Sequence, residues 1–168
     1  AGKSTLVKIF YGVLKHDSGT IEINNQLINI SSPQSARKNG VGMVFQHFSL
    51  FPALTVAENI LIALDQKIGF QRLISDIRKL SKEWDLFIDP LRLISDLSVG
   101  ERQRVEIIRC LMQNPKLLIT DEPTSVLTPQ EIENLFKILK RLSKSGCSIL
   151  YISHKLEEII ELANQVTI

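Results

Sequence analysis

Residues 97–123 read LSVGERQRVEIIRCLMQNPKLLITDEP, and this stretch decides the fold of the chain. Ser98 followed three residues later by Glu101 is a capping box, which predicts the start of a helix. Apolar residues then recur at helical spacing until the Asn-Pro pair at 114–115 ends the pattern. Residues 117–119 are all apolar, which is typical of a buried parallel strand. The stretch therefore predicts a helix that leads into a buried strand.

Two adjacent acids, Asp121 and Glu122, end this predicted strand. Carboxylates at the carboxyl end of a buried strand are costly unless they hold a metal or take part in chemistry. Taken alone, Asp-Glu-Pro would be read as a turn with solvated carboxylates. However, residues 2–5 (Gly-Lys-Ser-Thr) match the end of a phosphate-binding loop and open an amphipathic helix. The two motifs together favour a functional role for the acids.

Length and composition limit the possible classes of protein. The 168 residues, 44% hydrophobic and 23% charged, suit one soluble globular domain with a real core. With 20 basic and 18 acidic residues and no block of like charge, nucleic acid is not expected as the main partner. No apolar run is long enough to span a membrane, so any link to a membrane must pass through a partner. Cys110 and Cys147 are isolated and predicted to be small buried hydrophobes.

The remaining elements follow from turn residues and periodicity. The first helix is expected to bury Leu6, Ile9, Phe10 and Val13. Strands are expected over residues 20–24, 27–30, 41–45 and 148–153. Further helices are expected from Pro33 to before Gly40, from Thr55 to about Leu64, over residues 70–87, from Thr128 to Gly146 and over residues 155–163.

Both ends of the chain interrupt a pattern. The phosphate-loop motif begins upstream of Lys3 with a further glycine and a strand, whereas the sequence starts at Ala1. Residues 164–168 look like a strand that is cut in mid-course. We therefore expect a fragment of a longer protein, incomplete at both ends.

An apolar loop follows the strand over residues 41–45. Residues 48–54 read FSLFPAL and carry three large apolar side chains, Phe48, Leu50 and Phe51. If these side chains are exposed, they predict a surface for a protein partner. If they fold back, they belong to the local core. The sequence leaves both interpretations open.

Five motifs in this order make the chain similar to the ATP-binding subunits of ABC transporters. They are the phosphate loop at 2–5, Gln46 at a strand end, the signature loop 98–101, the Walker B strand 117–122, and His154 at the end of the next strand. The resemblance covers essentially the whole chain. It implies an α/β fold, a P-loop NTPase with a mostly parallel sheet, and a small helical subdomain inserted at about residues 55–112.

The resemblance also implies a role for each motif. ATP and Mg²⁺ are the implied cofactors, Ser4, Gln46 and Asp121 the implied metal ligands, and Glu122 the group that deprotonates the attacking water. His154 and Gln46 are the further residues implied in catalysis. The implied nucleotide-binding residues are Gly2, Lys3, Ser4, Thr5, Ser98, Gly100 and Asp121, with Ser98 and Gly100 contacting the ATP bound to a second ATPase domain.

Two departures from the common family pattern suggest a branch. Val99 and Glu101 stand where the usual signature has Gly and Gln, and Thr128 stands where the loop after Walker B usually ends in Asp. These features resemble the branch that imports nucleosides and simple sugars, in which two ATPase domains are often fused in one chain. The implied partners are a second, head-to-tail ATPase domain, a transmembrane permease subunit and an extracytoplasmic solute-binding protein, with the chain peripheral on the cytoplasmic face of the inner membrane.

Two alternatives remain open at this stage. The chain resembles, to a lesser degree, a soluble ABC ATPase that acts on ribosomes or DNA, although the apolar loop at 48–54 suits a membrane subunit better. It could also be a non-catalytic remnant, because the first loop glycine and the feeding strand are missing. Co-purification with a membrane protein would test the first alternative, and nucleotide binding the second.

Overall fold

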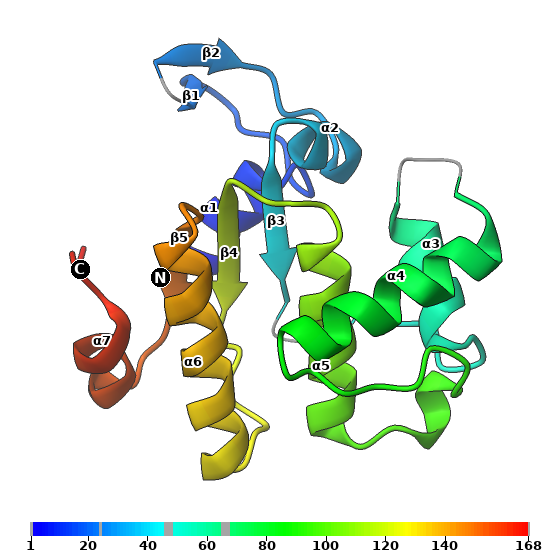
Figure 1. Cartoon of the computed structure of the whole chain (residues 1–168). Helices are drawn as coiled ribbons and strands as arrows, with labels where there is room; N and C mark the ends of the chain where they lie inside the picture. The colour runs from blue at the N-terminus through cyan, green and yellow to red at the C-terminus, as the bar shows by residue number, and fades with distance from the viewer. Residues whose placement is uncertain (1, 24, 46–48, 65–67, 168) are drawn as a thin grey trace.

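Three parallel strands form the centre of the molecule. The computed structural model describes residues 2–23, 25–45, 49–64 and 68–167. The strands are β3 (Val41–Val44), β4 (Leu117–Asp121) and β5 (Ser148–Ile152), with β4 in the middle (Figure 1). Their apolar, β-branched composition suits burial on both faces. Because all three strands run in the same direction, their carboxyl ends meet at one edge of the sheet, as the sequence predicts.

Helices cover both faces of this sheet (Figure 1). On one face, α1 (Lys3–Phe10) and α2 (Pro33–Lys38) pack on alternate strand residues such as Met43 and Ile119. The other face packs against α5 (Val99–Leu111) and α6 (Pro129–Lys144) through Val44 and Leu118. In turn, α3 (Val56–Ala63) and α4 (Phe70–Glu83) pack on α5 (Figure 1). The arrangement is a three-layer α/β fold.

The smaller elements lie at the margins of the sheet. An antiparallel pair, β1 (Ile21–Ile23) and β2 (Gln26–Ile28), stands apart from the parallel strands (Figure 1). A short 3₁₀ turn (Ile94–Asp96) precedes α5, and α7 (Leu156–Leu162) follows β5. Among the described residues, no helix is both long enough and apolar enough to cross a lipid bilayer.

Local sequence determines where the principal helices begin. In three of them an N-cap hydroxyl accepts a hydrogen bond from the third helical N–H, and the carboxylate of that third residue accepts one from the N-cap N–H. The pairs are Thr55–Glu58, Ser98–Glu101 and Thr128–Glu131. All three capping boxes predicted from the sequence are confirmed.

The face that α1 buries differs from the expected one. Val7 and Tyr11 are buried, whereas Leu6 is 50% exposed and Val13 46% exposed. The two buried residues are four apart, so they share one helical face and contact the cluster around Met43. Apolar residues occupy most sides of this helix, and its period alone therefore could not fix which side faces the sheet.

Two further boundaries also differ from expectation. Helix α4 ends at Glu83 rather than at residue 87, because Asp85 takes a left-handed conformation (φ 54°) and Leu86 turns into the core. Trp84 lies at this end, with the Arg141 guanidinium 4.2 Å from its ring centroid. Residues 164–167, which the sequence predicts to begin a strand, form no strand in the described part of the chain.

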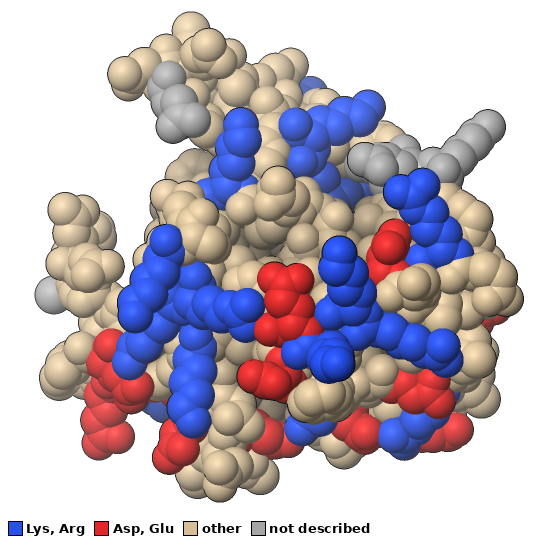
Figure 2. All heavy atoms as spheres, in the orientation of Figure 1, with Lys and Arg blue, Asp and Glu red and all other residues tan. Residues whose placement is uncertain are grey.

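Charged side chains of both signs are interspersed on the surface. Figure 2 shows Lys and Arg next to Asp and Glu across the face seen in Figure 1. This mixture agrees with the formal net charge of only +2. The surface thus carries no single-sign field on this face that would steer a polyanion.

Candidate functional site

The start of α1 and the end of β4 meet at the carboxyl edge of the sheet. Ser4 Oγ donates a hydrogen bond of 3.3 Å to Asp121 Oδ1 across 117 residues of sequence. Asp121 is 4% exposed and is the last residue of β4. The fold therefore brings the hydroxyl of the phosphate-loop motif to the first acid of the Asp-Glu pair.

The first turn of α1 is open to solvent. Gly2 precedes it in a left-handed conformation (φ 96°), which favours glycine, and residues 2–5 are exposed. The first N–H groups of a helix lack intrahelical partners, and the helix dipole adds a partial positive charge there. With the Lys3 side chain beside them, these groups can bind an anion such as phosphate.

Glu122 lies one residue beyond β4 in an unusual backbone conformation. Its φ is 48°, which a residue other than glycine rarely adopts, while its N–H still donates to the Ile152 carbonyl at 3.0 Å. This geometry turns the side chain toward the end of the neighbouring strand. His154 Nδ1 lies 3.1 Å from Glu122 Oε1, and the side chains are 66% and 29% exposed respectively. A carboxylate and an imidazole are thus paired at the sheet edge, where both can reach a bound substrate.

The donor set at this edge suits a hard cation better than a soft one. Within the described ranges, no cluster of three or more His, Cys, Asp and Glu could hold a metal ion. Ser4 and Asp121 instead offer one hydroxyl and one carboxylate oxygen within hydrogen-bond distance of each other. Mg²⁺ is usually held by one or two protein oxygens together with waters and substrate phosphates. The pair fits that mode of binding.

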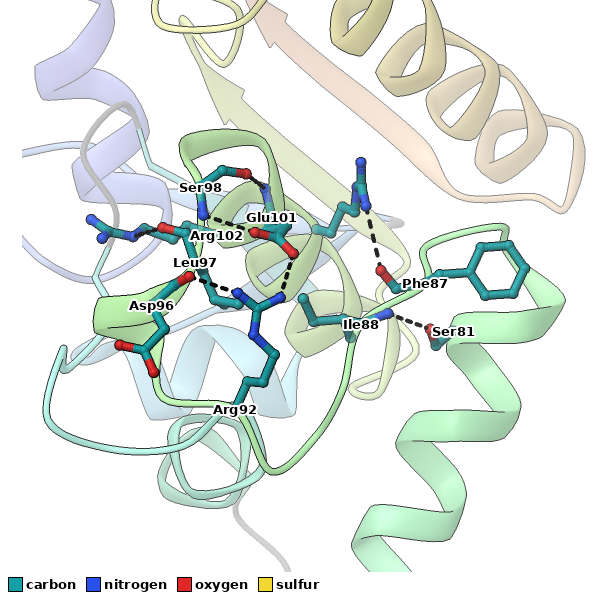
Figure 3. Close-up of polar contacts among 10 residues, drawn as sticks. Ser81, Phe87, Ile88, Arg92, Asp96, Leu97, Ser98, Glu101 and Arg102 are labelled. Atoms are coloured by element: carbon teal, nitrogen blue, oxygen red, sulfur yellow. Dashed lines mark hydrogen bonds and ion pairs between the residues drawn. The ribbon is translucent and has the colours of Figure 1, made fainter.

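The first turn of α5 is held by a network of polar contacts (Figure 3). Arg92 donates to Glu101 Oε1 at 2.7 Å and to the Asp96 carbonyl at 2.6 Å. Hydrogen bonds from the Ser98 N–H and hydroxyl, together with Arg92, lower the pKa of Glu101, with the backbone bond contributing most. The network fixes the start of α5, while Ser98 itself stays exposed.

Gly100 faces the molecule rather than solvent. A Cβ at this position would lie 1.7 Å from Glu131 Oε1, the carboxylate of the α6 capping box. Nearby, the Gln103 side chain donates to the Pro123 carbonyl at 2.8 Å and ties α5 to the turn after β4. Helices α5 and α6 consequently begin side by side at the end toward which β4 points (Figure 1).

The apolar loop after β3 is partly described. Gln46, His47 and Phe48 lie outside the described residues. Phe51 is 56% exposed, whereas Leu50 packs against the main core. Of these two side chains, one is exposed and one folds back into the core, and a role of the loop in binding a protein partner stays a prediction.

Two buried side chains fix this loop from behind. Asn59 accepts from the Phe51 N–H at 2.7 Å and donates to the Phe51 carbonyl. Glu106 of α5, fully buried, accepts from the Ser49 N–H at 3.0 Å and pairs with Arg109. Burial raises the pKa of Glu106, although Arg109 and Ser49 oppose this shift.

Another buried acid, Glu158 of α7, was not identified from the sequence. Its carboxylate accepts hydrogen bonds from Thr124, Tyr151 and Ser153 and pairs with Lys155. Thr124 follows Glu122 by two residues, and Ser153 precedes His154. Sequence reasoning missed this cluster because Thr124 and Glu158 are 34 residues apart in the chain. The sequence shows only that polar residues lie near the Glu122 and His154 motifs.

The structure therefore brings part of the predicted site together. Ser4 contacts Asp121, and Glu122 lies beside His154 at the same sheet edge. Within the described residues, no hydrogen bond joins Ser98 or Gly100 to any of these four. The two groups of predicted site residues are separate in this chain.

Comparison with known proteins gives a consistent result. The family model described as "ABC transporter" matches residues 1–125. The chain is 44% identical over 172 residues to the nucleoside import ATP-binding protein NupA of Lactococcus lactis subsp. cremoris, covering 100% of this chain and 34% of that protein. It is 40% identical to the ribose import ATP-binding protein RbsA of Caldanaerobacter subterraneus subsp. tengcongensis, covering 98% of this chain and 34% of that protein. The chain thus spans about a third of the length of these relatives.

Solved structures resemble the whole described fold. The ADP conformation of MJ1267, an ATP-binding cassette of an ABC transporter, matches with a TM-score of 0.80 at 28% identity, covering 96% of this chain and 69% of that one. A dimeric post-hydrolysis state of the ATP-binding cassette MJ0796, bound to ADP and Pi, matches with a TM-score of 0.77 at 26% identity, covering 94% and 72%.

Proposed function

This chain belongs to the ABC transporter family, and from that membership we propose that it is the ATP-binding and ATP-hydrolysing part of an importer for nucleosides or simple sugars. Its fold is that of a P-loop NTPase. The proposed solute class follows the relatives, whose names are those of nucleoside, ribose and galactose import proteins.

The observation that carries the proposal is the pair of contacts at the sheet edge. Ser4 lies 3.3 Å from Asp121, and Glu122 lies 3.1 Å from His154. Ligands of open α/β sheets bind outside the carboxyl ends of the strands, where all four residues are found. A nucleoside triphosphate at this edge would reach the first turn of α1 with its phosphates.

Each residue at this edge has a proposed role in binding. The N–H groups of residues 2–5, Lys3 and the Thr5 hydroxyl bind phosphate oxygens. Ser4 and Asp121 hold Mg²⁺, with Gln46 as a further ligand from outside the described residues. The metal, when bound, neutralises charge that develops on the phosphates. Glu122 accepts a proton from the attacking water, and His154 donates a hydrogen bond to the terminal phosphate.

Ser98 and Gly100 are proposed to act on a second ATPase domain. Among the described residues, Ser98 and Gly100 make no hydrogen bond to the four residues at the sheet edge, which supports a role toward ATP bound elsewhere. The start of α5 also offers N–H groups and a helix dipole to an anion. A related cassette has been solved as a dimer. We therefore propose a head-to-tail pair of ATPase domains.

The remaining partners lie on the membrane side. An exposed Phe51, on a loop fixed by buried side chains, supports contact with a transmembrane permease subunit. An extracytoplasmic solute-binding protein would deliver the solute, and the ATPase would be peripheral on the cytoplasmic face of the membrane. Residues 55–112 remain proposed as the helical subdomain that carries α5 toward the second ATPase domain.

Replacement of Glu122 by Gln tests the proposed function. In the intact protein, Glu122→Gln should keep ATP binding and reduce hydrolysis by roughly 10²–10⁴-fold, because an amide cannot accept the proton. Steady-state phosphate release and ATP affinity are measured on the same preparation. Glu133→Gln, on the exposed side of α6, is the matched control and should behave as the unmodified protein. Turnover of Glu122→Gln within a few-fold of the control would contradict the assignment.

A further inference from the structure

Glu158 is a buried acid that the proposed mechanism does not use. It lies on α7 and is 5% exposed, although carboxylates are rarely buried unless they are paired and hydrogen-bonded. Its neighbour Glu157 points to solvent, and so do Leu156 and Ile160, at 71% and 74% exposure. Leu162, one turn further along the same face of α7, packs partly buried against the main core, but apolar packing gives a carboxylate no hydrogen-bond partner, so the burial of Glu158 depends on its polar contacts.

The contacts of Glu158 reach two separate segments. Oε1 accepts from Thr124 Oγ1 at 2.5 Å, and Oε2 accepts from Ser153 Oγ at 2.7 Å. Lys155 Nζ contacts both residues: it pairs with Glu158 Oε1 at 3.2 Å and donates to Thr124 Oγ1 at 3.2 Å. A single carboxylate thus bridges the turn after β4 and the turn after β5.

Those two turns carry the Glu122–His154 pair. Thr124 follows Glu122 by two residues, and Ser153 is bonded to His154 through the chain. Glu122 also has a strained backbone (φ 48°), and strained conformations persist only where neighbouring contacts hold them. The bridge therefore joins the two short segments that carry the side chains of the pair.

We propose that Glu158 is a positioning residue for the Glu122–His154 pair. Its carboxylate holds Thr124 with one oxygen and Ser153 with the other, and so fixes the two strand ends relative to each other. The inference rests on the proposed function for its catalytic consequence, but the positioning itself is a separate structural claim. Since Glu158 touches neither Lys3 nor Ser4, its loss should affect turnover and not nucleotide affinity.

Tyr151 offers a contrast within the same cluster. Its hydroxyl donates to Glu158 Oε2 at 2.8 Å, but it lies inside β5, where the strand backbone already fixes its place. Thr124 lies in a turn, where the hydrogen bond to Glu158 is a principal restraint. If Glu158 positions the pair, removal of the Thr124 hydroxyl should slow turnover more than removal of the Tyr151 hydroxyl.

The kinetic test uses the intact protein with its membrane partner. Glu158→Gln and Thr124→Val should each lower kcat about tenfold with ATP affinity within about twofold, because small displacements of catalytic groups cost up to about 10²-fold in rate. Thr124→Ser, which keeps the donor, should restore most of the activity. Glu157→Gln is the matched control, and Tyr151→Phe should lie near it. A kcat for Glu158→Gln and Thr124→Val equal to that of the control would overturn the proposal.

A second readout separates this proposal from the proposed function. The sequence has three histidines, so the His154 imidazole resonances can be assigned by NMR with a His154→Gln reference. Glu158→Gln and Thr124→Val should shift these resonances, and Glu157→Gln should not. Unchanged resonances in both variants would refute the positioning role even if Glu122→Gln abolishes hydrolysis. If the resonances shift in Glu158→Gln and Thr124→Val while Glu122→Gln keeps full turnover, the positioning role is supported and the proposed catalytic roles are refuted.

Discussion

At the scale of single residues, two buried threonines, one in β4 and one in the turn after it, lead to opposite expectations. Thr120 lies inside β4, 1% exposed, and its hydroxyl has no hydrogen-bond partner among the described residues. Thr124, 3% exposed, donates to Glu158. A buried polar group without a partner costs free energy, whereas a bonded one does not.

Thr120→Val should therefore stabilise the fold. Valine keeps the shape of threonine and removes the unpaired hydroxyl, so the free energy of unfolding should rise by about 1 kcal/mol. Urea unfolding followed by circular dichroism measures the change. Thr124→Val is the matched comparison and should lower stability, because it removes one of the donors to the buried Glu158 carboxylate and the oxygen that accepts from Lys155. A loss of stability in Thr120→Val as large as in Thr124→Val would contradict this interpretation.

At the scale of elements, hydrogen bonds between residues close in sequence determine where the principal helices begin. These helix starts could therefore be predicted from the sequence. A capping box needs only two side chains three residues apart, so Ser98–Glu101 and Thr128–Glu131 could be recognised directly. The buried side of α1 was not predictable, because Leu6 and Val7 are both apolar and only the sheet decides between them. The Glu158 cluster depends on contacts between distant segments, which periodicity does not report.

The capping-box acids also give the fold a pH dependence. Hydrogen bonds lower the pKa of Glu58, chiefly from the Thr55 side chain, and that of Glu101, chiefly from the Ser98 N–H. For an acid with a lowered folded-state pKa, the stabilisation is complete above its ordinary pKa and is lost as the pH falls through the lowered value. Stability should therefore decline below the ordinary glutamate value of 4.5.

Glu101→Gln should weaken this acid dependence. Glutamine also completes a capping box, so α5 should still begin at its present residue. Because glutamine does not titrate, the free energy of unfolding should fall less as the pH is lowered below 4.5. The midpoint of urea unfolding measured at several pH values checks this. Glu133→Gln, on the exposed side of α6, serves as the control. An acid dependence in Glu101→Gln as steep as in the control would show that the capping box does not contribute.

At the scale of the whole molecule, the sequence motifs predicted the architecture well. The predicted α/β fold with a mostly parallel sheet is confirmed, because apolar runs followed by polar residues identify buried strands and their carboxyl ends. The contacts of Ser4 with Asp121 and of Glu122 with His154 follow from that topology. The left-handed backbone of Glu122 does not follow from the topology, because it depends on contacts with the neighbouring strand.

The separation of Ser98 from the sheet-edge residues is the feature that pairing of two ATPase domains would explain. Ser98 lies exposed at the start of α5, and within the described residues no hydrogen bond links it to Ser4, Asp121 or Glu122. The exposed position of Ser98 supports our proposal that it contacts nucleotide bound to another ATPase domain. A change at Ser98 should therefore act on pairing and not on binding within one domain.

Ser98→Arg should abolish ATP hydrolysis while leaving ATP affinity of the unpaired domain unchanged. The bulky guanidinium would occupy the space that the partner's phosphates need, and it also removes the hydroxyl cap of α5. Ser98→Ala loses the same cap without added bulk, and Ser75→Arg adds the same charge on the exposed side of α4. Both control variants should retain ATP-dependent pairing and ATP hydrolysis. Light scattering measures the pairing, and phosphate release measures the hydrolysis. If ATP affinity of the unpaired domain falls in Ser98→Arg as much as turnover does, Ser98 acts on the nucleotide of its own domain and the head-to-tail arrangement is wrong.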